Sequence, residues 1–317
     1  RGAWFERGEA DLYAAIGDGK IRGTICCAVD HWRNEQRGER TAILGFNHYL
    51  PDYGVAAALW DHGASWARAR GLDRLLGPFD LDYENAYGVL VEGYDRPPTL
   101  MCGHSPRYYR EYIERYGFRP GREQNLAFAV DLDTYRDPEG PMAKLHRVAR
   151  KVRERGQVSV RSARLDDWDA EMARLLGLMN CALRVLPDHL PWRAERLAAM
   201  ADDMRDVIDP DLVLFGEIDE EPVGVLVALP NLNEVLIHAN GLRYPWDRLV
   251  AWWHLRRPRE CLCIKSTLVD PDHWGRGVDA LLFDEIGSRA VARGYHWVDM
   301  SITGAENPMT VRICERL

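Results

Sequence analysis

The chain has 317 residues, of which 46% are hydrophobic and 28% charged, as in a globular protein of about two domains. Its formal net charge of −8 argues against a nucleic-acid-binding protein, because binding to the phosphate backbone requires a basic field. No apolar run approaches the ~18 residues that span a bilayer, and no basic leader opens the sequence, so we expect a cytoplasmic protein.

The first half of the chain reads as a hairpin followed by alternating strands and helices. Two β-rich runs flank the turn Gly17-Asp18-Gly19, which is typical of a β-hairpin. The elements expected here are a hairpin at 10–30, a strand at 41–50, a helix at 54–71, a strand at 72–81, a helix at 105–118 and a strand at 124–132.

The second half repeats this order after a basic helix near 139–156. Val278, Leu281 and Ile286 follow helical spacing, and Gly294 is a helix stop. The elements expected here are helices within 165–210, a hairpin at 212–230, a strand at 261–271, a helix at 277–294, a strand at 295–303 and a last helix that ends near 317.

The sequence of one predicted helix occurs twice in the chain. Residues 54–71 and 277–294 are identical at ten of eighteen positions without a gap, among them Gly54/Gly277 and Asp61/Asp284. Shared helix composition does not produce so many identities. The repeat therefore predicts a duplicated α/β unit with its strands in the same order in both copies.

The duplication sets the domain boundaries that we expect. Residues 1–135 form the first domain, 136–157 a basic linker helix and 158–317 the second domain. The first copy continues into the strand 124–132, whereas the second stops at Leu317, and no initiator Met is present. We therefore expect a fragment that is cut at both ends.

The two copies differ in the loop before the repeated helix. The first reads Pro51-Asp52-Tyr53-Gly54, and the second Pro271-Asp272-His273-Trp274-Gly275-Arg276-Gly277. Amides at a helix N-terminus have no intrahelical acceptor and lie at the positive end of the helix dipole, which suits a phosphate. Only the second copy has this longer, glycine-bearing loop.

The strand, loop and helix at 261–294, with Asn307 downstream, resemble the GNAT superfamily of acyl-CoA N-acyltransferases, whose motif Q/R-x-x-G-x-G/A holds the CoA pyrophosphate. More closely, the chain resembles a bacterial group of tandem-GNAT proteins, largely uncharacterised N-acyltransferases with some relatives that acylate long-chain amino lipids, through the segments 77–98, 105–118, 229–245 and 274–283. The resemblance implies an α/β protein with two tandem GNAT-like folds, each a mixed central sheet flanked by helices, the first a degenerate copy without the phosphate loop.

The resemblance also implies a transferase that moves an acyl group from acyl-CoA to a primary amine of a small-molecule or lipid acceptor, without a metal. Trp274 stands where the motif has Gln or Arg, and Asp279 where it has Gly or Ala, whereas Gly277 keeps its type. The residues expected at the CoA are Thr267, Leu268, Val269, Trp274, Gly275, Arg276, Gly277, Val278, Asp279 and Asn307.

Acyl transfer to an amine needs a base for the amine proton and donors for the oxyanion. The resemblance implies that a backbone N–H within 266–269 donates the hydrogen bond to the oxyanion. The strand 261–271 contains no Glu, so the candidates for a single base are Glu234, His238, Asp270 and His273. The usual acid for the leaving thiolate, seven residues after the Asn of the motif, falls on Cys314, a poor acid for a thiolate of similar pKa.

The first copy lacks the phosphate loop, so we assign it no CoA. Tyr83, Asn85 and Tyr87 are expected to line an acceptor pocket between the domains. The basic helix at 143–157 offers either peripheral membrane contact or a solvated charged face.

A rival interpretation is a non-catalytic tandem-GNAT module that binds acyl-CoA or is purely structural. Trp274, Asp279 and Cys314 favour it, since each departs from the superfamily pattern.

Overall fold

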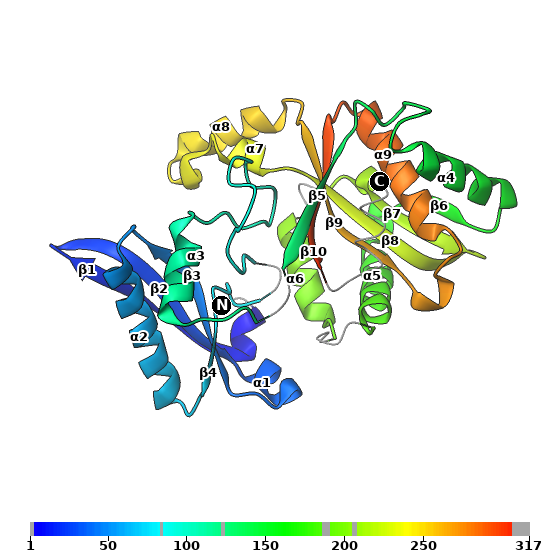
Figure 1. The fold of residues 1–317 in the computed structure, drawn as a ribbon. Helices are drawn as coiled ribbons and strands as arrows, with labels where there is room; N and C mark the ends of the chain where they lie inside the picture. The colour runs from blue at the N-terminus through cyan, green and yellow to red at the C-terminus, as the bar shows by residue number, and fades with distance from the viewer. Residues whose placement is uncertain (1–2, 83–84, 122–123, 186–190, 205–207, 306–317) are drawn as a thin grey trace. The chain divides into compact units, whose positions relative to one another are not determined.

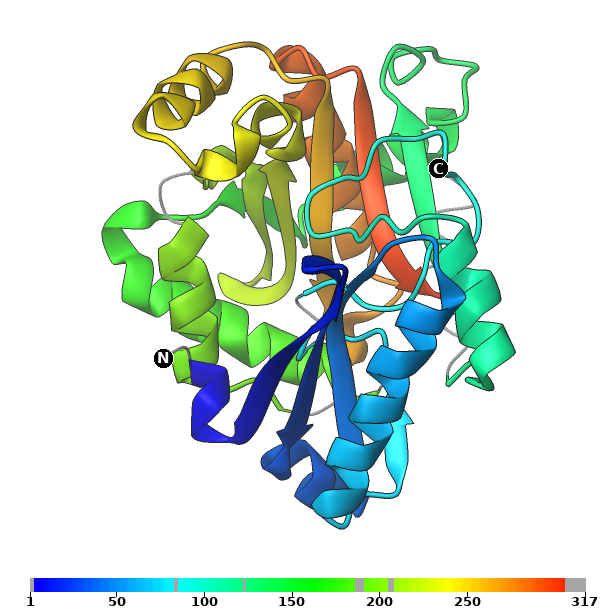
Figure 2. The same cartoon turned by 90° about the vertical axis from the view of Figure 1, so that its left-hand side faces the viewer.

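The computed structural model describes residues 3–305 except 83–84, 122–123, 186–190 and 205–207. The chain divides into two compact units, Arg1–Arg122 and Glu123–Leu317, each of which carries its own sheet (Figures 1 and 2).

The first unit is a four-stranded sheet in the order β1-β2-β3-β4. Pairing is antiparallel except between β3 and β4, which run parallel. Helix α2 buries Leu59 and Trp60 against β2 and β3. The elements are η1 (Ala3–Glu6), β1 (Gly8–Gly17), β2 (Lys20–Asp30), α1 (His31–Arg37), β3 (Thr41–Tyr49), α2 (Tyr53–Ala69), β4 (Arg74–Leu76) and α3 (Tyr108–Tyr116).

The second unit is a six-stranded sheet in the order β5-β10-β9-β8-β7-β6. Only β9 and β10 run parallel; the other neighbours are antiparallel. The strands are β5 (Asn125–Asp131), β6 (Ser159–Ser162), β7 (Val213–Ile218), β8 (Glu221–Pro230), β9 (Cys261–Val269) and β10 (Trp297–Gly304).

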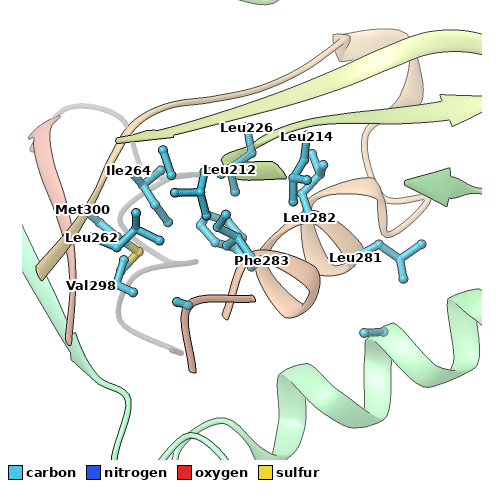
Figure 3. Packing of buried hydrophobic residues seen from close by; sticks show 14 of the residues in the cluster. Leu212, Leu214, Leu226, Leu262, Ile264, Leu281, Leu282, Phe283, Val298 and Met300 are labelled. Atoms are coloured by element: carbon cyan, nitrogen blue, oxygen red, sulfur yellow. The ribbon is translucent and has the colours of Figure 1, made fainter. Parts of the chain in front are cut away.

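Helices cover both faces of this sheet. Residues of α9 and α4 share one core cluster with Leu214 and Leu226 of the sheet (Figure 3), and residues of α5 and α6 share another with Phe215 and Val225. The helices are α4 (Ala143–Arg155), η2 (Leu165–Asp167), α5 (Trp168–Leu183), α6 (Ala194–Met204), η3 (Pro210–Leu212), α7 (Asn233–Leu236), η4 (Asn240–Leu242), α8 (Pro245–Leu255), η5 (Pro271–His273) and α9 (Val278–Ala292).

The predicted fold class and the duplication are confirmed by the strand registers. In the first unit, residues 41–43 of β3 pair with 74–76 of β4. In the second, residues 261–263 of β9 pair with 297–299 of β10. Each parallel contact uses the first three residues of the earlier strand, and β1-β2-β3-β4 and β7-β8-β9-β10 follow the same order. The repeated helices α2 and α9 connect equivalent strands.

The observed units divide the chain earlier than the expected boundary at residue 135. Strand β5 follows the first copy in sequence, yet it pairs antiparallel with β10 along the whole of that strand. It covers an edge of β10 that would otherwise lack a hydrogen-bonding partner. Helix α4, expected as a linker, buries Ala149 and Val152 in the core beside α9, so it too is an integral part of the second unit.

A buried ion-pair network ties α5 to the edge of the second sheet. Glu171 of α5, 1% exposed, accepts two hydrogen bonds from the Arg161 guanidinium at 2.9 and 3.0 Å and one from Arg174. Arg161 also donates to Glu217 at 2.6 Å. Burial acts to raise the pKa of Glu171, but the arginines outweigh it and lower the pKa below its ordinary value.

Protonation of Glu171 is therefore expected to destabilise the second unit. Because the folded-state pKa lies below the unfolded value of about 4.3, this stabilisation is complete above that pH and is lost as the pH falls through the folded pKa. Glu171→Gln should lower the free energy of unfolding at pH 7 by ~3 kcal/mol, measured by urea denaturation.

The matched control is Glu114→Gln, which removes an exposed partner of Arg110 and should change the free energy of unfolding by less than ~0.5 kcal/mol. Equal effects of the two substitutions would contradict the proposed role of the Glu171 network.

Candidate functional site

Strands β9 and β10 separate after their first three paired residues. Beyond this point β9 stays paired with β8 as far as Val269, and β10 stays paired with β5 as far as Gly304. We call the stretch formed by 264–269 and 300–304 the strand divergence. Backbone groups that face such a gap between parallel strands can bind an extended ligand or the carbonyl of a thioester.

A β-bulge at Lys265 accompanies the divergence. Strand β8 pairs Ala228 with Ile264 and Val227 with Ser266, so Lys265 has no opposite residue. A bulge bends the strand and reverses the alternation of its side chains. Leu262 and Ile264 accordingly pack on the α9 side before the bulge, and Leu268 packs on the α5 side after it.

The loop from β9 to α9 forms the predicted strand–loop–helix arrangement. It begins with η5, and the Trp274 indole N–H donates to the Val269 carbonyl at 3.0 Å. Gly275 and Gly277 have φ of 78° and 84°, in the left-handed region that favours glycine. Gly277 is the N-cap of α9 and supplies no side-chain cap, so the first amides of α9 remain available to an anion.

Helix α4 completes this corner. A cavity of about 360 Å³ lies beside the loop and is lined by Val152, Arg155, Gln157, Val158, Gly275 and Arg276. Two guanidinium groups, one amide side chain and the loop backbone therefore surround one space. Gly277 packs closely on α4, since a Cβ there would lie 2.4 Å from Val152 Cγ2.

The donor groups of this corner fit a CoA diphosphate and pantetheine arm. Thr267 Oγ1 and His273 Nδ1 are buried without a hydrogen-bond partner among the described residues, and both flank the route from the strand divergence to the loop. Buried polar atoms without partners are costly unless a ligand or water satisfies them. Arg155 and Arg276 supply positive charge for phosphates.

A buried acid–base pair lies where the strands separate. Lys265 Nζ is 3.4 Å from Asp299 Oδ2, and the Ser301 hydroxyl donates to Asp299 Oδ1 at 2.6 Å. Asp299 is 4% exposed. Sequence reasoning missed these residues. The signal available was the repeat itself, because the first copy has Gly45 and Leu76 at the positions of Lys265 and Asp299.

The N-terminus of the first copy's helix is closed by its own side chain. Asp52 caps α2 by accepting the Gly54 N–H at 2.8 Å. A carboxylate in this position satisfies the amide and repels a phosphate.

The first copy also fills the space between its parallel strands. After β4 the chain returns to β3, where the Phe79 N–H donates to the Leu44 carbonyl and the Phe46 N–H donates to Asp80. Burial raises the pKa of Asp80. A Cβ at Gly45 would lie 2.5 Å from the Phe79 carbonyl, so no ligand backbone or side chain has room there.

The four base candidates are not brought together. Glu234 accepts the Glu260 and Cys261 amides at 2.9 and 3.0 Å, at the start of β9, and His238 stacks on His254 at 4.1 Å. Asp270 and His273 follow the end of β9, ~25 Å away along the strand. At most one of these pairs can reach the reacting amine.

Asp270 is held in the loop by local contacts. It accepts the Asp272 amide at 3.0 Å and lies 4.0 Å from Arg184. Burial acts to raise its pKa, but the Asp272 amide, the Cys181 thiol and nearby positive charges lower it.

The other expected site residues are placed as follows. The Val278 side chain is buried in the core, so only its amide faces the loop, and Asp279 lies in the first turn of α9. Asn85 donates to Asp82, and Tyr87 packs on Phe79 with ring centroids 6.0 Å apart. Tyr83, Asn307 and Cys314 lie outside the described residues.

The basic helix α4 uses its apolar stripe inside the second unit, where Ala149 and Val152 are buried. Arg153 binds Asp284 of α9, as does His146 at 2.6 Å.

Membrane contact through 143–157 stays a prediction. No helix in the described ranges combines the length and apolar character needed to cross a bilayer. In the same part of the chain, no group of three or more His, Cys, Asp or Glu side chains is arranged to hold a metal.

Comparison with known proteins gives relatives but no matching family model. Bacterial ceramide synthase of Caulobacter vibrioides is 30% identical over 259 residues, which cover 80% of this chain and 64% of the relative. Protein YghO of Escherichia coli is 28% identical over 238 residues, 75% of this chain and 59% of the relative. The chain thus spans about six-tenths of the length of both curated relatives.

Among solved structures, a tandem GNAT protein from the clavulanic acid biosynthesis pathway superposes with a TM-score of 0.54 at 13% identity, covering 98% of this chain and 79% of its own. At this identity the likeness concerns the fold. A GCN5-related N-acetyltransferase from Sphaerobacter thermophilus superposes with a TM-score of 0.51 at 16% identity, covering 97% of this chain and 76% of its own. With its duplicated sheet, diverging β9 and β10 and uncapped α9, the chain has the tandem GNAT fold that its sequence predicts.

Proposed function

We propose that this chain is the tandem-GNAT part of an N-acyltransferase that moves an acyl group from acyl-CoA to the primary amine of a long-chain amino lipid. The observation that carries the proposal is the strand divergence between β9 and β10, which leads directly to the uncapped N-terminus of α9. No comparable pair of features exists in the described part of the first unit, where both are closed by Asp52 and Asp80.

The donor is proposed to bind along the second unit. The diphosphate would lie at the amides of Gly277 to Asp279, beside Arg276 and Arg155. The pantetheine arm would follow the strand divergence, with polar contacts from Thr267. CoA, when bound, supplies the activated thioester; the chain orients it and stabilises the oxyanion with backbone N–H groups of β9.

The amine proton needs an acceptor close to the thioester carbon. We assign this role to Asp299, because it is the carboxylate at the point where the strands part, and Lys265 and Ser301 fix its orientation. Attack by the amine nitrogen on the carbonyl carbon forms the amide bond, breaks the C–S bond and releases the thiolate, which takes up a proton from solvent.

The acceptor class rests on the relative named bacterial ceramide synthase. A ceramide is the N-acyl amide of a long-chain amino alcohol. Acyl transfer to the amine of such a lipid is therefore the reaction that we propose. This chain covers 64% of that relative, so a lipid acceptor is proposed for this chain from the likeness.

Arg276→Gln and Arg155→Gln should each weaken CoA binding by at least about tenfold, since a charge-assisted hydrogen bond contributes ~1.5–3 kcal/mol. Isothermal titration with CoA at constant ionic strength measures the change. Neither guanidinium forms an ion pair within the described residues, so the fold should be unaffected. Arg110→Gln, on α3 of the first unit, is the control; an equal loss of affinity there would place CoA elsewhere.

Asp299→Asn should lower kcat for acyl transfer to a long-chain amine by ~10² or more, as expected for loss of a general base, with the dissociation constant for CoA changed less than about twofold. The control is Asp284→Asn, which removes another buried, ion-paired carboxylate, one that lies on α9 and binds Arg153 and His146 of α4. A similar fall in kcat for both variants would mean that destabilisation alone explains the loss.

The non-catalytic alternative is tested by the same preparations. Tight CoA binding without thiol release from acyl-CoA in the presence of long-chain, short-chain and aromatic amines would favour a binding module, consistent with Trp274 and Asp279 in the loop.

A further inference from the structure

The connection between β8 and β9 is much longer than its counterpart in the first copy. Residues 231–260 link these strands and form α7, η4 and α8, whereas residues 31–40 link β2 and β3 and form only α1. Figures 1 and 2 show α7 and α8 in yellow at the end of the sheet where β9 begins. We call this segment the β8–β9 insertion.

The insertion exposes most of its large apolar side chains. Trp246, Leu249 and Trp253 follow i, i+3, i+7 spacing along one face of α8 and are 59%, 68% and 52% exposed. The opposite face carries Asp247, which is buried. The other exposed large apolar residues of the insertion are Leu236, Ile237, Leu242, Tyr244, Trp252 and Leu255.

Polar contacts hold the insertion in this orientation. Asp247 accepts the Tyr244 amide at 2.8 Å and forms the capping box of α8. His238 and His254 stack between α7 and α8, and Glu234 binds the amides at the start of β9. The apolar face is therefore built to point outward, and it is not a surface left over from loose packing. Contiguous exposed apolar area of this kind marks an interaction site.

The charges around the apolar face are mainly positive. Arg256 lies 3.5 Å over the Trp252 ring, and Arg257 lies 3.6 Å over the Trp253 ring; Arg243 and Arg248 are exposed nearby. Two of the three acidic groups of the insertion, Glu234 and Asp247, are already used internally. This basic cluster stands out in a chain of net charge −8.

We infer that the β8–β9 insertion docks on a lipid bilayer that contains anionic headgroups. Indole rings favour the interface between headgroups and acyl chains, and arginine stems can lie along apolar surface while their guanidinium groups reach phosphates. A second copy of the chain fits less well, because a two-fold contact would place the same four arginines against one another.

Docking of this kind would serve an enzyme whose acceptor is a lipid, because the insertion is anchored through Glu234 to the first residues of β9, the strand that forms one wall of the strand divergence. The inference does not depend on the proposed function, since vesicle binding requires neither CoA nor turnover.

Two variants test it. Trp246→Gln/Leu249→Gln/Trp253→Gln removes apolar contact, and Arg248→Gln/Arg256→Gln/Arg257→Gln removes charge. The control is Lys144→Gln/Arg147→Gln/Lys151→Gln, which removes the same charge from exposed positions of α4. All substituted side chains are exposed, and unchanged thermal unfolding and circular dichroism check that each variant is folded.

Flotation is carried out with vesicles of phosphatidylcholine alone and with phosphatidylglycerol added. The unmodified chain should bind the anionic vesicles, and less so as salt is raised. The arginine variant should lose more than about tenfold in partitioning, because each surface arginine contributes about fivefold. The Trp246/Leu249/Trp253 variant should also lose more than about tenfold, because it removes the apolar contact with the acyl chains. Binding of the α4 control should be unchanged. The inference is overturned if anionic vesicles are not bound, if only the α4 variant loses binding, or if the tryptophan variant instead abolishes a concentration-dependent dimer.

Discussion

The bulge at Lys265 is the local irregularity on which the arrangement of the second unit depends. By inserting one residue opposite β8, it bends β9 away from β10 while both strands keep their outer partners. The sheet stays continuous for three paired residues and then parts. A regular strand would close the sheet and leave no backbone groups for a thioester. The same bulge moves Lys265 to the place where it can pair with Asp299, so one backbone feature sets both the gap and the charges beside it.

The first unit shows what the same scaffold does when these groups are satisfied internally. Its parallel strands also pair over three residues, but Phe79 and Asp80 take up the backbone groups of β3, and Asp52 takes up the helix amide. An unpaired backbone group is costly to bury. A copy that binds no donor is more stable when its own chain supplies the partner, whereas a copy that binds a donor must leave the groups unsatisfied until the ligand arrives.

The sequence was sufficient for the features that depend on local periodicity and on the repeat. It predicted the two hairpins, the strand order, α2 and α9, and the loop around Gly275, because each has its signal within about twenty residues. It could not predict the partner of β5, since pairing with β10 joins residues far apart in the chain. It also missed the pair of Lys265 and Asp299, because the bulge at Lys265 breaks the alternation from which the direction of a side chain is inferred. It did not predict that the apolar stripe of α8 faces outward, because the same spacing is typical of a helix that packs on a core.

Two of the differences between the copies lie at the two ends of one strand. Three extra residues follow β9 and create the uncapped helix N-terminus, while the β8–β9 insertion precedes it and creates the aromatic, basic surface. The paired positions at the start of β9 keep the register of β3, because a shift by one residue would turn every core side chain to the wrong face. Connections tolerate added length far better than strands do. A duplicated scaffold that acquires a donor site and a docking surface is therefore expected to change just beyond both ends of a strand. Within the strand an extra residue is accommodated as a bulge, as at Lys265.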